Sequence, residues 1–369
     1  MRDATELLFP AATLRLVGSR IFQAVGALPD AAAIVARSLV EANLAGHDSH
    51  GVIRIPEYVE RARAGTIRPA ARPSLTMDRR ATALVSGNWG FGQVAGIFAI
   101  DQGVARAKEH GVAAVGLIRC NHLGRLGEYM ERASVAGCVA LAWVGGLGGA
   151  HQAVPYGGAE PAYGTNPIAA AFPAGPAGPV VVDFATTAIA GGKVMVADAA
   201  GELLAPGCIV DRHGRPTTDP QDFLGGGALL PFGGHKGYAL AVLAELLGQA
   251  LTGAAQAGDE GGGGPPFRRA GALFVVLHAG LFCAEEKVED VAVATVERIR
   301  AVRPAPGFER VLVPGEPEAL VRKGRQADGI PLPLETWHKI TAAATSVHAP
   351  LDDIPDYIGA GRAPGERPA

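Results

Sequence analysis

The residue types with the clearest chemical potential lie together where a predicted apolar helix ends, within 45–67. Imidazoles titrate near neutral pH, and a guanidinium grips a carboxylate through two parallel hydrogen bonds. Packing gives no reason to gather such groups, so the segment is a candidate proton-transfer site for a carboxylate substrate. The alternative is a polar helix terminus with surface charges. The residues concerned are His47, Asp48, Ser49, His50 and Arg54.

The composition is typical of a large α/β protein that handles ligands. A chain of 369 residues, 48% of them hydrophobic, has ample material for a core and for two domains or one elaborate one. Its 51 glycines against only 19% charged residues indicate tight turns and close backbone approaches. A net charge of −3 with no basic stripe argues against a nucleic-acid partner.

Cysteine usage and hydropathy predict a cytoplasmic protein that does not enter a membrane. The four cysteines are far apart and form no CxxC pair, so we expect them to be reduced and mostly buried. The opening MRDATELLF lacks a basic stretch followed by an apolar one, so we expect no secretory signal. The longest apolar run, 238–251, contains Glu245 and is too short to span a bilayer, which predicts a buried helix. The cysteines are Cys120, Cys138, Cys208 and Cys283.

Apolar spacing predicts alternating helices and strands, the pattern of an α/β fold. Two helices are expected within 11–45, broken near 26–29, and a third over 55–64. The tract 253–266 is expected to be a mobile loop. The predicted strands are 81–86, 112–118, 139–144, 167–172, 179–184 and 273–278. The remaining predicted helices are 93–110, 126–136, 236–251, 285–302 and 334–346.

We expect three parts in the chain. An N-terminal helical region, 1–78, carries the DSHG motif and packs with 285–358. An α/β core spans 79–284, and 359–369 forms a flexible tail.

The segment WGFGQVAG, 89–96, comes close to a dinucleotide-binding fingerprint. It follows a predicted strand and opens a predicted helix, where glycines let a pyrophosphate approach the helix N-terminus. Its spacing is GxGxxxG, however, and the next strand ends in Ile118 and Arg119 with no acidic residue. We therefore interpret Gly92 as a turn glycine and reject a Rossmann fold.

Three further segments place polar residues at predicted strand ends. In CNHLGRLGEYM, His122 follows a strand and precedes Gly124 and Arg125, which suit a phosphate, although a structural histidine is the alternative. YGTNPIAAAFP places Thr165 and Asn166 before a strand, where a plain turn is the alternative. VVVDFATTAIAGGK ends a strand with Asp183, for which helix capping is the alternative.

FGGHKGYALA begins a long apolar helix with Lys236 in its first turn. Lysine is mildly unfavourable at that end of a helix, which favours a bound phosphate or carboxylate. The same side chain is a candidate Schiff-base lysine for pyridoxal phosphate, and the sequence leaves both roles open.

Taken jointly, these segments resemble the type-2 malate/L-lactate dehydrogenase family, NAD(P)-dependent oxidoreductases unrelated to the Rossmann malate dehydrogenases. The forms PTTDP, HKGYALA and GRLGEY are most similar to the family's hydroxycarboxylate dehydrogenase branch, cytoplasmic 2-oxo acid reductases. The resemblance implies an α/β fold whose nicotinamide site lies on a non-Rossmann sheet with a flanking helical domain, and a homodimer. The matching segments are ANLAGHDSHG, FGQVA, NHLGRLGEY, PYGGAE, YGTNPIA, VDFATTAIAGGK, PGCIVDRHGRPTTDP, HKGYALA, LVPGE and GIPLP.

The resemblance also implies roles for individual residues. His50 and His122 would lie beside the nicotinamide, Ser49 would orient His50, and Arg54 would bind the substrate carboxylate. Thr165 and Asn166 are expected to add to the substrate pocket. The cofactor would contact His50, Gly124, Arg125, Leu126, Val182, Asp183, Phe184, Ala185, Thr186, Lys236, Pro314, Gly315 and Glu316.

Two positions depart from the family pattern. Lys193 stands where imine-reducing members carry an acidic residue that serves a serine–histidine relay, which favours keto and hydroxy acids as substrates. The segment 145–153 is richer in glycine than expected, so its pocket contacts are not carried over.

We therefore expect hydride exchange between NAD, or NADP, and C2 of a small 2-oxo or 2-hydroxy acid, with an imidazolium protonating the developing alkoxide in reduction. His50 is favoured as the proton carrier for its neighbours Ser49 and Arg54, although His122 stays open. One rival is a metal-dependent hydrolase or lyase using His47, His50 and His122, which no HExxH-like spacing supports. A noncatalytic binding protein would leave the clustered histidines unexplained.

Overall fold

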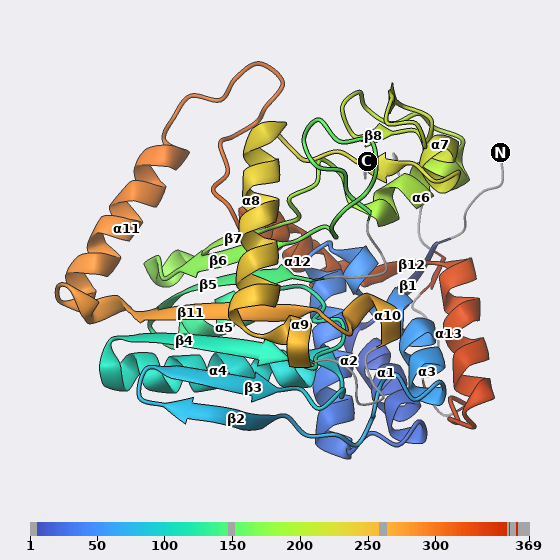
Figure 1. Cartoon of the computed structure of the whole chain (residues 1–369), viewed down its shortest axis with the longest axis horizontal. Helices are drawn as coiled ribbons and strands as arrows, with labels where there is room; N and C mark the ends of the chain where they lie inside the picture. Colours follow the sequence, from blue (N-terminus) through green and yellow to red (C-terminus); the bar gives the residue numbers. More distant parts are fainter. Residues whose placement is uncertain (1–5, 147–151, 258–263, 353, 355–358, 361–369) are drawn as a thin grey trace.

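Seven strands form the central sheet of the computed structural model, which describes residues 6–146, 152–257, 264–352, 354 and 359–360 (Figure 1). The strand order is β2-β3-β4-β11-β5-β6-β7. β3 and β4 run parallel, and every other neighbouring pair in this sheet is antiparallel. The strands are β2 (Ser74–Arg79), β3 (Thr82–Ser86), β4 (Val112–Ile118), β5 (Cys138–Gly145), β6 (Ile168–Phe172), β7 (Val180–Phe184) and β11 (Gly271–His278).

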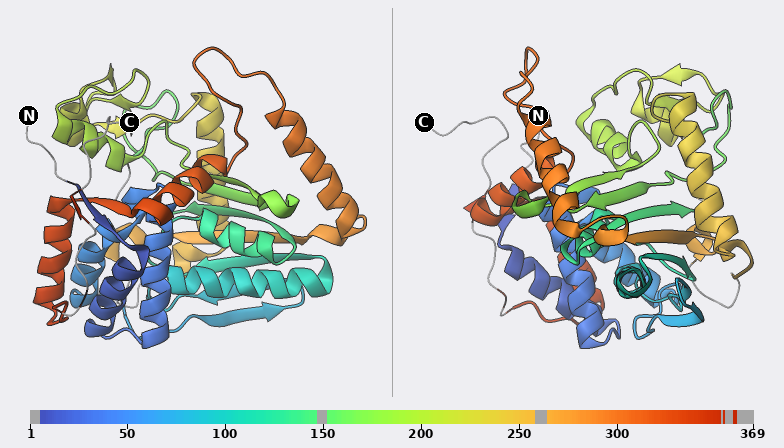
Figure 2. Two further views of the ribbon diagram at one scale, coloured as in Figure 1. Left: turned by 180° about the vertical axis from the view of Figure 1, so that it is seen from behind. Right: turned by 90° about the vertical axis from the view of Figure 1, so that its left-hand side faces the viewer.

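Helices cover both faces of this sheet, as Figure 1 and Figure 2 show. α4 (Gly92–His110) and α5 (Gly127–Val135) lie on one face, and α8 (His235–Glu245) lies on the other and continues as a π-helix, Leu246–Leu251. Close packing needs small residues: a Cβ on Gly103 of α4 would lie 2.7 Å from Val276 of β11. The mixed, largely antiparallel sheet is not the parallel sheet of a Rossmann fold.

A helical region beside one end of the sheet joins the two ends of the chain. It contains α1 (Ala11–Ala24), α2 (Pro29–Leu44), α3 (Ile55–Arg63) and α13 (Leu334–Ser346). β1 (Glu6–Phe9) pairs with β12 (Ile330–Pro333) on one side and β13 (Gly359–Ala360) on the other. Their shared core buries Ile55, Tyr58 and Val59, which fixes the face that α3 presents to the sheet.

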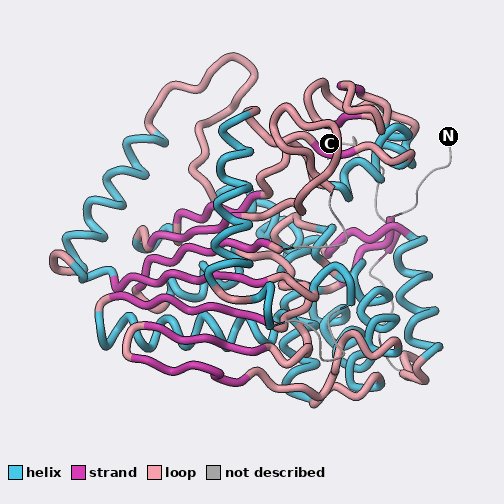
Figure 3. Tube along the Cα trace, in the orientation of Figure 1, coloured by secondary structure: helices cyan, strands magenta, loops and turns pink. Residues whose placement is uncertain are grey.

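The remaining elements surround these two cores, and Figure 3 shows how much of this part is loop. α6 (Gly191–Ala200) and α7 (Pro220–Leu224) accompany a small sheet of β8 (Ile209–Val210), β9 (Pro216–Thr217) and β10 (Ala228–Leu229). α12 (Glu316–Asp328) packs on α2, and α11 (Glu285–Arg300) stands off the body of the molecule (Figure 2).

The structure confirms the predicted α/β class and six of the seven strands of the central sheet to within two residues at each end. The expectation of a buried helix over 238–251 is wrong, because α8 packs against the sheet on one side only and leaves Leu243, Leu246 and Leu251 exposed. The tract 253–266, predicted as a loop, contains the single-turn helix α9 (Ala254–Ala257) and the start of α10 (Gly264–Phe267), with 258–263 outside the described residues. Residues 361–369 of the predicted tail also lie outside them.

All four cysteines are free, and three of them are buried while Cys283 is exposed. Within the described ranges, none of the helices combines the length and apolarity that crossing a membrane requires.

Candidate active site

A cavity of about 310 Å³ lies where α3 faces the ends of β4, β5 and β11. Its lining includes four residues that the sequence singled out, namely His50, Arg54, His122 and Thr165. The cavity also contains polar and aromatic side chains that sequence reasoning did not select, namely Glu57, Arg61, Asn121 and Phe267. A concave site with convergent polar groups is the expected form of a small-molecule site.

The two histidines stack beside each other in this cavity. Their ring centroids are 5.4 Å apart, with 24° between the ring planes. The His50 side chain is half-buried, and protein atoms surround its ring closely. This loss of hydration, together with the nearby Arg54 charge, lowers the pKa of His50 to about 4. Burial and the same guanidinium also hold the pKa of His122 well below its usual value. Both imidazoles are therefore neutral at physiological pH.

Each histidine has a different partner on Nδ1. The Ser49 hydroxyl lies 3.0 Å from Nδ1 of His50, as expected for a serine that orients this ring. The Tyr58 hydroxyl lies 2.7 Å from Nδ1 of His122, and Nε2 of Gln93 donates to the same Tyr58 oxygen at 2.8 Å. Tyr58 and Gln93 are fully buried, so this second arrangement belongs to the core as well as to the site.

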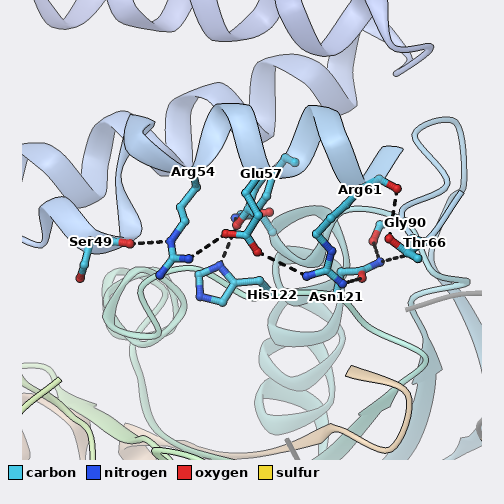
Figure 4. A network of polar contacts seen from close by, with 10 residues as sticks. Ser49, Arg54, Glu57, Arg61, Thr66, Gly90, Asn121 and His122 are labelled. Carbon is cyan, nitrogen blue, oxygen red and sulfur yellow. Dashed lines mark hydrogen bonds and ion pairs between the residues drawn. The ribbon is translucent and has the colours of Figure 1, made fainter. Parts of the chain in front are cut away.

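A ladder of charges along α3 faces the cavity (Figure 4). Nη1 of Arg54 donates to Glu57 at 2.7 Å, and the other Glu57 oxygen lies 3.5 Å from Nη1 of Arg61. The i, i+3 and i, i+4 spacings place the three side chains on one helix face. Nε of Arg54 also donates to the Ser49 carbonyl at 2.6 Å, which ties the ladder to the His50 turn.

The loop that carries His122 is held by its neighbour and by a glycine. Nδ2 of Asn121 donates to the carbonyls of Trp89 and Gly90 at 2.9 Å each. A Cβ on Gly92, at the start of α4, would lie 2.1 Å from the His122 carbonyl oxygen. Gly92 is therefore a packing glycine that lets α4 touch the loop that carries His122.

Two of the expected cofactor segments meet beside the cavity. Gly124 and Leu126 line it, and Asp183 accepts a 2.7 Å hydrogen bond from the amide of Gly127. Burial raises the pKa of Asp183, while that amide and the Arg125 guanidinium counteract the shift. The carboxylate of Asp183 thus joins the start of α5 to β7 and its segment Val182, Asp183, Phe184, Ala185 and Thr186.

The turn Pro314, Gly315 and Glu316 lies against the same strand. The amide of Val181 donates to the Pro314 carbonyl at 3.0 Å, and Gly315 has φ +96°. Arg300 pairs with the Glu316 carboxylate at 2.7 Å; the Val313 amide and Arg300 outweigh its slight burial and lower its pKa.

These segments fit a polar, partly anionic cofactor. Nη1 of Arg125 is buried without a hydrogen-bond partner among the described residues, on a side chain that is 3% exposed. Oδ1 of Asn166 is also buried without a hydrogen-bond partner among the described residues. Buried donors are normally satisfied, so the unpartnered Arg125 nitrogen, next to Gly124 and Leu126 of the cavity lining, is consistent with a bound anionic group.

Asn166, Lys236 and Lys193 also lie outside the cavity. Asn166 is fully buried in a left-handed conformation, φ +38°, and its amide donates to Ala241 and Glu245 on α8. Lys236 is exposed in the first turn of α8, where Phe232 links the helix to Thr186 by a backbone hydrogen bond. Lys193 is exposed at the start of α6, and the adjacent Gly192 lies against Ser49.

The other polar residues of the DSHG segment bind α12. His47 lies 3.4 Å from Glu318, and Asp48 takes two hydrogen bonds from Arg325, at 2.6 and 2.9 Å. Among the described residues, no group of three or more His, Cys, Asp or Glu side chains is placed to hold a metal ion. His47 and Asp48 are thus engaged elsewhere, and the hydrolase or lyase alternative gains no support.

The site residues that sequence reasoning missed carry few local signals. Tyr58 and Gln93 sit on apolar helix faces and read as core, while Glu57 and Arg61 read as solvated helix charges. Arg61 lies over the Phe267 ring at 4.4 Å, a contact between residues about two hundred positions apart. The i, i+4 acidic–basic spacing of Glu57 and Arg61 was the one readable hint.

Comparison with known proteins agrees with this architecture. The family model for malate/L-lactate dehydrogenase matches residues 9–341. The chain is 36% identical to hydroxycarboxylate dehydrogenase B of Escherichia coli O157:H7, covering 94% of this chain and 96% of that one. It is 35% identical to the Delta(1)-pyrroline-2-carboxylate/Delta(1)-piperideine-2-carboxylate reductase of Pseudomonas putida, covering 89% and 94%.

A solved structure gives the same result. Sulfolactate dehydrogenase from Methanocaldococcus jannaschii superposes with a TM-score of 0.85 at 31% identity, covering 94% of this chain and 99% of that one. The predicted family and the non-Rossmann α/β fold are confirmed. The protein belongs to the malate/L-lactate dehydrogenase family.

Proposed function

We propose that this protein exchanges a hydride between a nicotinamide cofactor and C2 of a small 2-hydroxy or 2-oxo carboxylic acid. Oxidoreduction of a hydroxy acid follows from family membership. The single observation that carries the proposal for this chain is the cavity in which two neutral imidazoles and a guanidinium meet beside converging cofactor segments. When bound, the nicotinamide supplies or accepts the hydride.

The chain's own residues bind the acid and handle its proton. Nε of Arg54 bonds Ser49 and Nη1 bonds Glu57, whereas Nη2 has no hydrogen-bond partner among the described residues. That nitrogen can therefore bind the substrate carboxylate. Thr165 lines the opposite wall and adds a hydroxyl. His50 and His122 face the position where the C2 oxygen would lie, so one polarises it and one exchanges the proton.

The finer assignments are also proposals. We propose NAD as the cofactor, with NADP possible, held by 124–126, 182–186, Lys236 and 314–316. We propose keto and hydroxy acids rather than imines, because position 193, next to the Gly192 that lies against Ser49, is a lysine and not an acid. We further propose the division 1–78 with 285–358, 79–284 and a tail 359–369, which the β1–β12 pairing and the α3–α13 contacts support.

A homodimer in the cytoplasm is the proposed form of the protein. The exposed leucines of α8 and its π-helical extension, together with an apolar groove of about 520 Å³ between α11 and β6–β7, are surfaces suited to a second copy. The absence of any disulfide among the cysteines supports a reducing compartment. Sedimentation of the purified chain tests the dimer.

A thermal-shift screen with NADH, NADPH and pyridoxal phosphate tests the cofactor class, because a ligand that binds the folded state raises the unfolding temperature. We expect one or both reduced nicotinamides to stabilise the protein and pyridoxal phosphate to have no effect. A panel of 2-oxo acids, followed by the loss of nicotinamide absorbance, then tests the reaction. Stabilisation by pyridoxal phosphate alone, or no turnover of any 2-oxo acid, would contradict the proposal.

A further inference from the structure

We propose that Tyr58 and Gln93 are positioning residues that hold neutral His122 with its proton on Nε2, so that His122 donates a hydrogen bond to the substrate oxygen and His50 exchanges the proton. This inference rests on the proposed function for its catalytic consequence. The tautomer of His122 itself is a property of the protein alone and is measurable without turnover.

The direction of the hydrogen bonds fixes the tautomer. In the orientation that the Gln93 amide adopts, Nε2 donates to the Tyr58 oxygen at 2.8 Å, while Oε1 is buried without a hydrogen-bond partner among the described residues. The single phenolic hydrogen then points at Nδ1 of His122, 2.7 Å away. Since Nδ1 accepts, the one hydrogen of the neutral ring is on Nε2.

Burial keeps this chain of donors in place. Tyr58 is 1% exposed and Gln93 is not exposed at all, and desolvation raises the pKa of the phenol, so Tyr58 stays protonated. The charged and titratable groups around His122 are Arg54, Glu57 and Arg61 of α3 and the His50 ring.

The hydrogen-bond partner of His50, the Ser49 hydroxyl, does not fix which nitrogen of the ring carries the hydrogen. The Ser49 hydroxyl rotates, so it can donate to Nδ1 of His50 or accept from it at 3.0 Å. His50 can therefore present Nε2 either as an acceptor or as a donor. Only this ring can take up a proton from a hydroxyl group and later release it.

The two rings then divide the reaction between them. In oxidation of a hydroxy acid, the C2–H bond breaks and its electron pair leaves with the hydride to the oxidised nicotinamide. The O–H bond breaks, its proton goes to Nε2 of His50, and its electrons form the C=O bond. His122 keeps its proton throughout and stabilises the oxygen through Nε2–H, because a neutral imidazole is too weak an acid to give that proton up.

A donor-replacement experiment separates the two roles in the full-length enzyme. Glutamine retains an N–H donor but cannot exchange a proton at neutral pH. We expect His122→Gln to retain at least tenfold more kcat than His122→Ala, because removing a donor of this kind costs roughly 10²–10³ in kcat. We expect His50→Gln to be as slow as His50→Ala, roughly 10²–10⁴ below the parent enzyme. The assignment would be overturned if His50→Gln had a much higher kcat than His50→Ala while His122→Gln were as slow as His122→Ala.

A second measurement reads the tautomer directly. In protein labelled with ¹⁵N-histidine, long-range ¹H–¹⁵N correlations identify which ring nitrogen carries the hydrogen. We expect Nε2–H for His122 in the parent and in the control Tyr163→Phe, which removes a buried tyrosine hydroxyl that donates to Val154 instead. We expect mixed tautomers in Tyr58→Phe, with a lower kcat, an altered pH profile and an unchanged KM for the nicotinamide.

Gln93→Glu provides an inversion test. Its carboxylate would accept from Tyr58, so the Tyr58 oxygen would accept from Nδ1–H of His122 and the tautomer would reverse. If Gln93→Glu does not fold, the Tyr58→Phe measurement still tests whether Tyr58 sets the tautomer of His122. An Nδ1–H signal in the parent, or no change in Tyr58→Phe, would refute the inference, whereas correct tautomers without hydroxy-acid turnover would refute the proposed function instead.

Discussion

Replacing Gly92 with alanine should damage the fold and the catalytic loop more than it damages cofactor binding. The new Cβ would lie 2.1 Å from the carbonyl oxygen of His122 and 2.5 Å from that of Asn121, while ordinary contact begins at 3.4 Å. The loop must therefore retreat by about 1.3 Å. Both obstacles are backbone atoms, so no side-chain rotation relieves the overlap.

Two magnitudes follow from this displacement. Overpacking of a well-packed position costs about 1–3 kcal/mol, which corresponds to a fall in Tm of roughly 1–4 °C for a protein of this size. A shift of about 1 Å in a catalytic group lowers kcat by as much as ~10²-fold, and His122 belongs to the displaced loop. Affinity for the reduced nicotinamide should change little, because the proposed cofactor segments 124–126, 182–186 and 314–316 do not include the two displaced carbonyls.

The assays are thermal unfolding, fluorescence titration with NADH and steady-state kinetics on the same preparation. Gly324→Ala is the matched control: it lies exposed in α12, nothing stands within 4 Å of its added Cβ, and alanine favours a helix over glycine by about 1 kcal/mol. We expect the control to have an equal or higher Tm and full activity. A Gly92→Ala protein with normal Tm and selective loss of NADH binding would restore the dinucleotide fingerprint that we rejected.

Three further outcomes are expected at the same site. Arg54→Lys should raise KM for 2-oxo acids strongly and leave NADH affinity unchanged, because lysine keeps the charge but loses the planar fork; equal losses in both would assign Arg54 to the cofactor. Glu57→Gln removes the carboxylate between two guanidiniums, so kcat/KM for dicarboxylic over monocarboxylic 2-oxo acids should rise about two- to fivefold; an unchanged ratio would show that this charge does not reach the substrate. Burial lowers the pKa of His50 to about 4, while an unfolded histidine titrates near 6.5. The contribution of neutral His50 to the free energy of unfolding is therefore fully present above about pH 6.5 and is lost as the pH falls from about 6.5 to about 4. Urea titrations at pH 7 and pH 5 should differ by about 2 kcal/mol from His50 alone, and His50→Asn should remove that part of the slope.

The fold was predictable from the sequence where a buried element has a recognisable pattern of apolar residues. β4 lies inside the sheet between β3 and β11 and reads as a continuous apolar run, so its bounds matched the prediction. α12 was missed because it has no buried residue: it is held by ion pairs of Arg322 and Arg325 with α2 and Asp48, which leave no apolar periodicity.

The site was predictable as a set of residue types but not as an arrangement. Spacing alone could identify His50 and Arg54 as candidates, because histidine, serine and arginine at a helix end have no packing role. It could not show that Asp48 would bind Arg325, 277 positions later, and leave the site. Tyr58 and Gln93 gave no signal either, because their function depends on a third residue brought by another element.

The pairing of β1 with β12 has a consequence for synthesis of the chain. The ribosome delivers the two histidines of the candidate site early, yet the strand and helix that complete the core under α3 come from residues 330–346, near the other end. Contacts of such long sequence separation form late and slowly. The nascent protein therefore carries its catalytic segment on an unfinished core for most of translation, and loss of the last forty residues should inactivate it without removing a single active-site residue.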